Sequence, residues 1–278
     1  MKDKKQGTGH TVLTLSILVV LGIFLVSAGL LCRSLYEYRK GEKEYGLLQR
    51  YAAKAPGREP ESRSPYSLSA GEQEPMLAVD FEALKKLNPH IIAWIHIPGT
   101  PVSYPVTQGE DNSYYLNRTF SKAYNGAGCI FMDYRSSLPS EGGNTVLYGH
   151  NMKNGSMFGS LKRYWDNEYY REHSSFYLYT AEGEIFLCHI TDRRRISAQT
   201  DFFSEMQDKE EEPGEDGKTD RDARVTLVTC VAGKNEERLA IEADAKKIFV
   251  YWQHKQIASA LKNLILPDFV VFSRNLNR

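Results

Sequence analysis

Eight short runs of β-branched and aromatic residues follow one another between residues 91 and 251, and Gly, Pro and Asn separate them. Runs of this length and composition are typical of β-strands, because they are too short and too branched for good helices. They are Ile91–Ile97, Val102–Val106, Cys129–Met132, Thr145–Tyr148, Phe176–Tyr179, Glu184–Ile190, Val225–Cys230 and Leu239–Tyr251. Because eight strands suit closure into a cylinder, we predict a mostly β fold, a closed eight-stranded barrel with short peripheral helices.

Two of those helices can be placed from local signals. Asp80 stands before Phe81–Leu87, where its carboxylate can accept the first backbone N–H groups of a helix, and Asn88-Pro89 ends the segment. Residues Phe158–Tyr164 predict a helical turn whose aromatic side chains pack rather than act. A third segment, which begins at Phe202, has room for at most a two-turn helix before Pro213.

The N-terminal segment predicts a membrane anchor. Residues 11–31 contain no charged side chain, and a helix of that length spans roughly the 30 Å hydrocarbon core. The run is longer than the apolar region of a signal peptide, so an uncleaved transmembrane helix is favoured over a cleaved leader. Lys2, Lys4 and Lys5 favour a cytoplasmic N-terminus of residues 1–10, although Arg33 and Arg39 weaken that signal. We expect the bulk of the chain to lie outside the cell membrane.

The remaining boundaries follow from composition. Residues 32–78 predict a stalk and linker, helical at first and then rich in Pro, Ser, Gly and Glu. Residues 79–252 form the predicted barrel domain, and residues 253–278 form a predicted C-terminal helix and tail. The acidic segment 207–222 predicts a solvated loop; it lacks the regular alternation of a calcium-binding loop.

Charge and cysteine usage exclude several functions. Lys and Arg total 35 and Asp and Glu total 35, so no basic excess is present to neutralise the phosphates of a nucleic acid. The four cysteines have neither the number for a disulfide framework nor the spacing of a zinc site. Cys129 and Cys188 fall within apolar strands and are expected in the core. We predict no metal and no cofactor.

The fourth cysteine lies at the end of a strand. Val225–Cys230 is followed by a Gly- and Asn-containing turn, and a second strand begins with Arg238. Such a hairpin places a thiol and a guanidinium at one rim of a sheet, and a nearby cation lowers the pKa of a thiol. The alternative is a small buried Cys230 and a solvated Arg238. A second strand ends on His150, and histidine beside a thiol is the usual base or ion-pair partner of a nucleophilic cysteine.

Several motifs resemble those of a known family. Tyr148–Asn151 and Thr226–Cys230 are similar to the histidine and cysteine motifs of sortases. Over residues 80–250, further motifs resemble class B sortases in family order: Trp94–Thr100, Tyr104–Val106, Asp111–Leu116 and Phe131–Tyr134. The resemblance implies an eight-stranded barrel and a cysteine transpeptidase that cleaves a C-terminal sorting signal after Thr. Class B relatives prefer Asn-Pro-x-Thr-x signals.

The resemblance also implies roles for individual residues. Cys230 attacks the Thr carbonyl, His150 exchanges protons, and Arg238 stabilises the oxyanion, since it does not act as a base. A second oxyanion donor is expected at the backbone N–H of Val231. Substrate contacts are expected at Asn112, Leu116, Tyr148 and Thr229. The expected partners are secreted proteins with a sorting signal and a peptidoglycan cross-bridge amine.

Two segments depart from the class B pattern. Class B members carry an amphipathic helix along the substrate groove, whereas residues 190–225 here are largely polar after Phe202 and Phe203. Val228 occupies a position where Ser is common. The alternatives are a pilin-polymerising sortase, a hydrolytic cysteine peptidase and a catalytically silent membrane-tethered binding module.

Overall fold

The computed structural model describes residues 6–54, 77–197, 199–208, 223–230 and 237–248. The chain divides into two compact units, Met1–Glu44 and Tyr45–Arg278. Residues 55–76 of the predicted stalk and linker lie outside the described residues, as do most of the acidic segment, Val231 and the predicted C-terminal helix.

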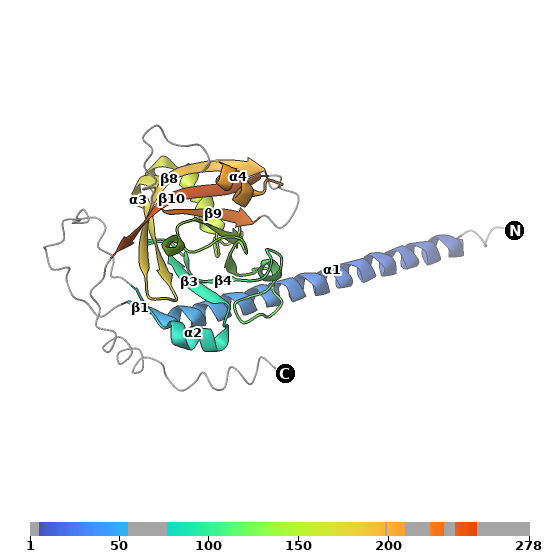
Figure 1. The fold of residues 1–278 in the computed structure, drawn as a ribbon. Helices are drawn as coiled ribbons and strands as arrows, with labels where there is room; N and C mark the ends of the chain where they lie inside the picture. The colour runs from blue at the N-terminus through green and yellow to red at the C-terminus, as the bar shows by residue number, and fades with distance from the viewer. Residues whose placement is uncertain (1–5, 55–76, 198, 209–222, 231–236, 249–278) are drawn as a thin grey trace. The chain divides into compact units, whose positions relative to one another are not determined.

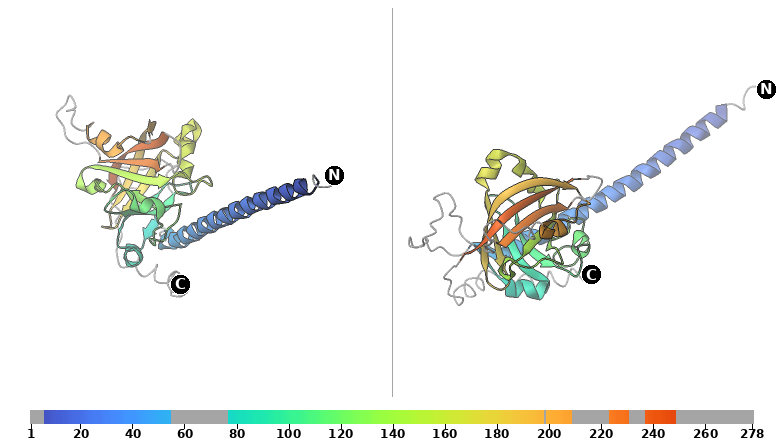
Figure 2. Two further views of the ribbon diagram at one scale, coloured as in Figure 1. Left: turned by 90° about the vertical axis from the view of Figure 1, so that its right-hand side faces the viewer. Right: turned by 45° about the horizontal axis from the view of Figure 1, so that its top comes forward.

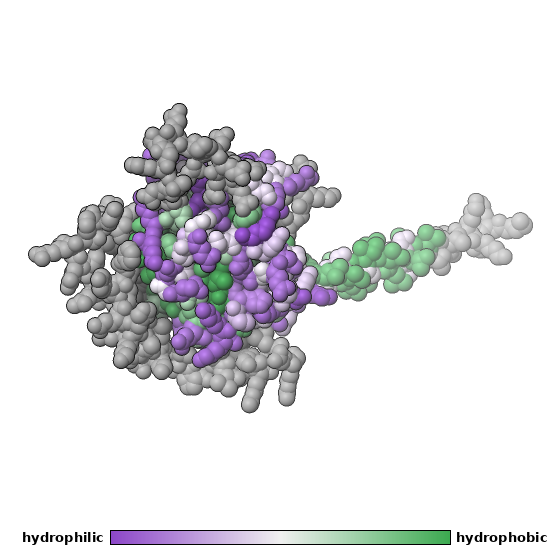
Figure 3. All heavy atoms as spheres, in the orientation of Figure 1, coloured by the Kyte–Doolittle hydropathy of each residue, from purple (hydrophilic) through white to green (hydrophobic). Residues whose placement is uncertain are grey.

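Helix α1, Gln6–Leu48, forms the first unit as far as Glu44, and its last turn belongs to the second unit. The helix passes without interruption through the predicted membrane segment and the first part of the predicted stalk. Its apolar side chains are exposed, with Val20 at 65% and Phe24 at 65%, and Figure 3 shows them as a mainly hydrophobic surface. An 18-residue window within Val12–Tyr51 has a mean hydropathy of 2.7. The helix is therefore long and apolar enough to cross a membrane.

The second unit contains a closed barrel of eight strands (Figure 1). Around the barrel the strands follow the order β10-β8-β7-β3-β4-β5-β6-β9, and the views in Figure 2 show them curving round a common interior. The strands are β3 Ile91–His96, β4 Ser103–Gln108, β5 Ile130–Met132, β6 Asn144–His150, β7 Ser175–Thr180, β8 Ile185–Ser197, β9 Ala223–Cys230 and β10 Glu237–Ile248. The predicted closed eight-stranded barrel is confirmed.

Two pairs of neighbouring strands, β4–β5 and β6–β9, are parallel, and all other barrel neighbours are antiparallel. A parallel pair needs a long connection, and the chain between β6 and β9 includes β7 and β8. The parallel pairing of β6 and β9 therefore brings together two strand ends that are far apart in the sequence.

Burial extends to both faces of several barrel strands. All seven residues of β6 are buried, although their side chains alternate between the two faces of the sheet. The largest fully buried side chains include Trp94, Tyr115, Phe158 and Tyr164. The peripheral 3₁₀ helices η2, Tyr114–Asn117, and η4, Gly159–Trp165, contribute Tyr115 and Tyr164 to this core, so segments outside the strands also pack against the barrel.

Short helices surround the barrel as predicted. Asp80 caps α2, because its Oδ1 accepts a hydrogen bond of 2.9 Å from the Ala83 N–H. The turn predicted after β6 is a 3₁₀ helix, and the segment after β8 forms a two-turn helix. The elements are α2 Phe81–Leu87, α3 Asn167–Glu172, α4 Phe202–Asp208, η1 Gln49–Tyr51, η2 Tyr114–Asn117, η3 Pro139–Glu141 and η4 Gly159–Trp165.

The structure differs from the predictions at two places. Strand β8 continues to Ser197 instead of ending at Ile190, because β10 pairs with it along its whole length. Within the predicted stalk, Tyr45, Leu48 and Tyr51 are buried in the core of the barrel unit, where their apolar side chains leave water. Next to them a two-stranded sheet pairs β1, Ala52–Lys54, with β2, Leu77–Val79.

Candidate active site

Three strand ends that carry the predicted catalytic residues lie side by side. In the parallel β6–β9 pair, His150 is the register partner of Cys230. In the antiparallel β9–β10 pair, Ala240 is the partner of Val228. Continuing that register by two residues places Arg238 opposite Cys230. The strand ends that carry His150, Cys230 and Arg238 therefore lie next to one another across β6, β9 and β10 and form one row of strand ends.

His150 is buried and held by the chain itself. Only 4% of the residue is exposed, and its Nε2 lies 2.6 Å from the carbonyl oxygen of Leu116. Because a carbonyl oxygen only accepts hydrogen bonds, Nε2 must carry a proton and donate it. This contact selects the tautomer, and Nδ1 is left as the ring nitrogen that can exchange a proton with a reacting group.

Gly128 makes the close approach of Leu116 and His150 possible. Its backbone has a φ of +61°, and a Cβ at this position would lie 2.6 Å from the Leu116 carbonyl oxygen and 2.9 Å from His150 Cδ2. A residue with a side chain would clash with both and would also adopt this φ at a cost. The carbonyl of Gly128 accepts a hydrogen bond from the Tyr45 hydroxyl at 2.5 Å, so the end of α1 supports the same loop.

Arg238 has a donor that is not used within the described part of the chain. The residue is half-buried, and its Nε atom is buried without a hydrogen-bond partner among the described residues. A buried guanidinium donor without a partner costs free energy, so such a donor is commonly kept for a bound group. The side chain of Cys230 and all of Val231 lie outside the described residues.

Two predicted substrate residues have roles inside the protein. Thr229 is 2% exposed, and its Oγ1 accepts a hydrogen bond of 3.0 Å from the Leu239 N–H. This bond ties the end of β9 to the start of β10, next to Cys230 and Arg238. Leu116 acts through its carbonyl, which orients His150. Substrate contact by either side chain stays a prediction.

The other two, Asn112 and Tyr148, meet at a residue to which the sequence assigned no role. Asn112 Nδ2 and the Tyr148 hydroxyl donate to the same oxygen, Oδ2 of Asp133, at 2.8 and 3.1 Å. The Asn112 Oδ1 in turn accepts from the Tyr134 N–H at 3.1 Å. Asp133 follows directly after the apolar strand β5, and a carboxylate at the end of a buried strand was the signal that could have singled it out.

Asp133 is a completely buried carboxylate whose charge is compensated. It accepts three further hydrogen bonds from Arg135, through the backbone N–H, Nε and Nη2, each at 3.0 Å. Burial by itself raises the pKa of Asp133, but the hydrogen bonds from Arg135 and Asn112 outweigh burial and bring the pKa below its ordinary value. The carboxylate therefore stays ionised and keeps its neighbours in place.

Comparisons with known proteins identify the family of the chain. The Sortase domain family model matches residues 95–246. Sortase B of Listeria monocytogenes is 31% identical over 236 residues, which cover 80% of this chain and 90% of that protein. The chain belongs to the class B sortases. As a member of this family it is a cysteine transpeptidase.

Solved class B sortases have the same fold. The crystal structure of sortase B from Bacillus anthracis in complex with AAEK1 is 31% identical, with a TM-score of 0.57, and covers 77% of this chain and 100% of that one. The Staphylococcus aureus sortase B–substrate complex is 26% identical, with a TM-score of 0.52, over 61% of this chain and 85% of that one.

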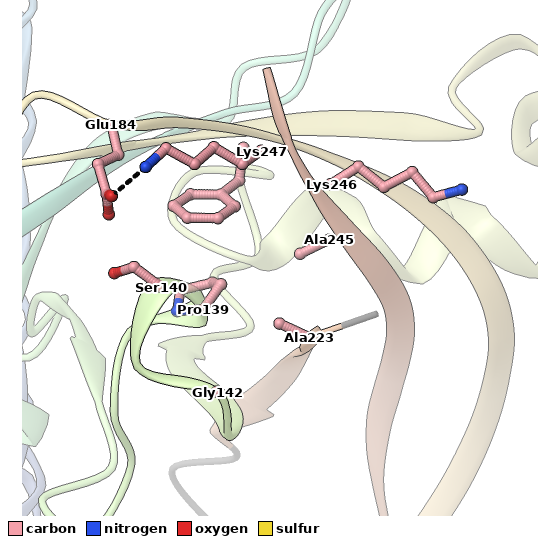
Figure 4. Close-up of a pocket in the computed structure, with 9 residues that line it drawn as sticks. Pro139, Ser140, Gly142, Glu184, Ala223, Ala245, Lys246 and Lys247 are labelled. Atoms are coloured by element: carbon pink, nitrogen blue, oxygen red, sulfur yellow. Dashed lines mark hydrogen bonds and ion pairs between the residues drawn. The ribbon is translucent and has the colours of Figure 1, made fainter. Parts of the chain in front are cut away.

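This sortase has a hollow of about 420 Å³ at the opposite edge of the barrel, where it is lined by the other ends of the strands. Glu184 and Lys247 are among its lining residues, and Figure 4 shows their side chains turned toward one another, with 2.6 Å between carboxylate and ammonium. The hollow includes Ala223 at the start of β9. The six residue steps from Asn144 to His150 along β6 span roughly 20 Å, so the hollow lies away from the row of strand ends that carry His150, Cys230 and Arg238.

Among the described residues of this sortase, no group of three or more His, Cys, Asp or Glu side chains is placed so that it could hold a metal ion. The predicted two-turn helix after β8 is confirmed as α4, which contacts β6. Val228, at the position where the resemblance expected Ser, is fully buried.

Proposed function

We propose that this sortase cleaves a C-terminal sorting signal after Thr and transfers the new carboxyl end to a peptidoglycan amine. The observation that carries the proposal is the pairing of His150 with Cys230 across β6 and β9, with Arg238 at the start of the adjoining strand β10. A nucleophile, a proton donor and a fixed cation at adjacent positions are what acyl transfer through a cysteine requires.

Acylation begins with the Cys230 thiolate and a protonated His150. The sulfur attacks the carbonyl carbon of the Thr, a carbon–sulfur bond forms, and the carbonyl oxygen gains negative charge. Arg238 donates hydrogen bonds to that oxygen, as does the Val231 backbone N–H. When the peptide bond breaks, His150 gives its Nδ1 proton to the leaving nitrogen, and a thioester remains on Cys230.

Deacylation reverses the proton transfer. The acceptor amine attacks the thioester carbon, and neutral His150 takes a proton from the attacking nitrogen. The carbon–sulfur bond breaks, an amide bond forms, and the thiolate and the imidazolium are restored. The hydrogen bond from Nε2 to Leu116 supports this cycle, because it keeps the ring in one orientation through both proton transfers.

We infer that Asn112, Leu116, Tyr148 and Thr229 border the bound signal. Asn112 and Tyr148 are joined through Asp133, and Tyr148 stands two residues before His150 on β6, on the same face of the strand. A signal peptide that extends from the Thr held at Cys230 would pass close to both residues.

We further propose that α1 anchors the enzyme with its N-terminus inside the cell and the barrel outside. The apolar length of α1 and the three lysines ahead of it support this orientation. Outside the membrane the barrel would meet both secreted proteins and peptidoglycan amines.

The test uses the full-length chain in detergent micelles with a panel of sorting-signal peptides, including Asn-Pro-x-Thr-x sequences. Each peptide is incubated with and without a glycine peptide or diaminopimelate, and the products are identified by mass spectrometry. The expected result is an amide between the Thr carboxyl group and the added amine, absent from the Cys230→Ala variant. Products that end in free Thr at every amine concentration would instead identify a hydrolase, and no cleavage of any peptide would refute the proposal.

A further inference from the structure

Arg135 links the buried carboxylate of Asp133 to a second acid outside the barrel wall. Its guanidinium donates to both oxygens of Asp201, from Nη1 to Oδ2 and from Nη2 to Oδ1, each at 2.7 Å. The same guanidinium donates to both oxygens of Asp133. One side chain thus holds two carboxylates in the planar, paired geometry that favours arginine over lysine.

Asp201 is the residue directly before α4. Its Oδ2 also accepts from the Ser204 hydroxyl at 2.9 Å, and its carbonyl accepts from the Glu205 N–H at 3.1 Å, so it forms part of the first turn. The hydrogen bonds from Arg135 lower the pKa of Asp201, and the pair therefore stays charged at neutral pH.

Helix α4 is attached to the barrel by its aromatic side as well. Phe202 and Phe203 are buried, and the Arg135 guanidinium lies 4.6 Å from the Phe203 ring centroid. From the other side, Arg194 of β8 lies over Phe202 and pairs with Glu205 at 2.7 Å. Both arginines contact this short helix, but of the two only Arg135 also donates hydrogen bonds to Asp133.

The connections through Asp133 and Arg135 join three segments. The first segment contains Asn112 and continues into η2, whose Leu116 carbonyl accepts from His150. The second is β6, which contains Tyr148 and ends at His150. The third is α4, which begins directly after Asp201. The bonds fix these three segments relative to one another. The bonds themselves do not involve His150, Cys230 or Arg238.

We propose that Arg135 is a positioning residue for substrate binding: through Asp133 and Asp201 it sets the position of α4 relative to Asn112 and Tyr148. The inference rests on the proposed function, since it takes the sorting signal to lie along Asn112 and Tyr148. It assigns to this short helix the placement of the substrate and leaves the proton transfers and the thioester step to the catalytic row.

The test compares steady-state kinetics of the full-length chain in detergent for a sorting-signal peptide that the wild type cleaves. Asp201→Asn keeps the shape of the side chain and removes the charge, and Arg135→Lys keeps the charge and removes the paired geometry. Each variant should raise KM roughly three- to tenfold, as expected for a charge-assisted pair that is partly open to solvent. The kcat should stay within about twofold, because Cys230, His150 and Arg238 are unchanged.

The double variant and a control complete the test. If the two residues act as one unit, Arg135→Lys combined with Asp201→Asn should raise KM no further than the larger single effect. Glu184→Gln breaks a different partly exposed ion pair, at the opposite edge of the barrel, and should leave KM and kcat unchanged. The rate at which iodoacetamide alkylates Cys230 should be equal in all variants, which reports that the folded site is intact.

The outcomes separate this inference from the proposed function. Wild-type turnover with an unchanged KM in both single variants would refute the role of Arg135 and leave the proposed function standing. A fall in kcat at constant KM would also refute it, because that pattern belongs to a group that acts on the reacting atoms. Absence of turnover by the wild type with every peptide would refute the proposed function and this inference together.

Discussion

The Nε2 atom of His150 donates a hydrogen bond of 2.6 Å to the carbonyl oxygen of Leu116, 34 residues earlier in the chain. The acceptor is backbone, so no substitution of the Leu116 side chain removes it directly. The contact depends instead on the space that Gly128 leaves beside both residues. A glycine outside the row of strand ends therefore leaves the space that this orientation of His150 needs.

The first prediction follows from this relationship. Gly128→Ala should lower kcat/KM by about 10²-fold, because the new Cβ would displace the Leu116 carbonyl and the His150 ring. Peptide transpeptidation assays would measure the loss. Gly126→Ala is the matched control: nothing lies within 4 Å of its added Cβ, and its activity should be that of the wild type. Full activity of Gly128→Ala would show that the ring does not need this fixed position.

The second prediction concerns the oxyanion. Arg238→Ala should lower kcat by roughly 10²–10³-fold, the usual effect of losing one oxyanion donor. Arg238→Lys should recover only part of this activity, because a lysine is a point charge without the planar fork of donors. Arg224→Ala removes an arginine of similar exposure from the start of β9, at the far end of the strand, and should have little effect. Equal rates for both alanine variants would exclude Arg238 from the mechanism.

The third prediction concerns the end of α1. Leu48 is 3% exposed within the barrel unit, so Leu48→Ala should lower the free energy of unfolding by about 2–5 kcal/mol. Leu35→Ala, at a position that is 54% exposed, should not change it. Denaturant titration of the barrel transition would measure both. By the same argument, a chain that begins at residue 45 should be more stable than one that begins at residue 77, and the reverse order would contradict the packing of Tyr45, Leu48 and Tyr51.

The fourth prediction concerns pH. The folded protein lowers the pKa of Asp133, so ionised Asp133 contributes stability that is complete above the unfolded-state pKa of roughly 3.9 and is lost as the pH falls toward the lower folded-state value. The difference in Tm between the wild type and Asp133→Asn should therefore be largest near neutral pH and should narrow below about pH 4. Glu184→Gln, whose partner Lys247 is more open to water, should show a smaller difference. A constant difference from pH 3 to 7 would contradict the lowered pKa.

The fifth prediction concerns the cysteines. Cys129 and Cys188 are 1% and 0% exposed, and burial raises the pKa of the Cys188 thiol, so both should resist alkylation in the folded protein. A polar thiol reagent followed by peptide mass mapping should modify Cys230 first and these two only after denaturation. Modification of Cys129 at the rate of Cys230 would contradict a selectively reactive Cys230.

The strands and the catalytic candidates could be predicted from the sequence because their signals are local. Val225–Cys230 and the run that ends at His150 are short and contain β-branched residues, and each is followed by a polar turn. The capping of α2 by Asp80 was likewise readable from one carboxylate and the residues that follow it. For these features the pattern and the structure depend on the same few neighbouring residues.

The remaining features of the fold and of the candidate site depend on contacts between segments that are distant in the sequence. No local pattern indicates that Asp133 receives Asn112, Tyr148 and Arg135, because each donor comes from a separate turn or strand. The continuation of β8 past Ile190 was missed because Arg193–Arg195 read as a polar segment, whereas the strand is defined by its partner β10. The burial of Tyr45 was missed because its helix has a long apolar part that dominates the pattern.

Strands β3 to β8 alone would form a six-stranded open sheet with β6 and β8 at its two margins, and only β9 and β10 fill the gap between them. In a chain without β9 and β10, His150 would therefore lie on an edge strand with no partner on one side. The pairing of β9 with β6 that helps to close the cylinder also places Cys230 beside His150. A chain cut before β9 would lack Cys230 and would leave His150 on an open edge of the sheet.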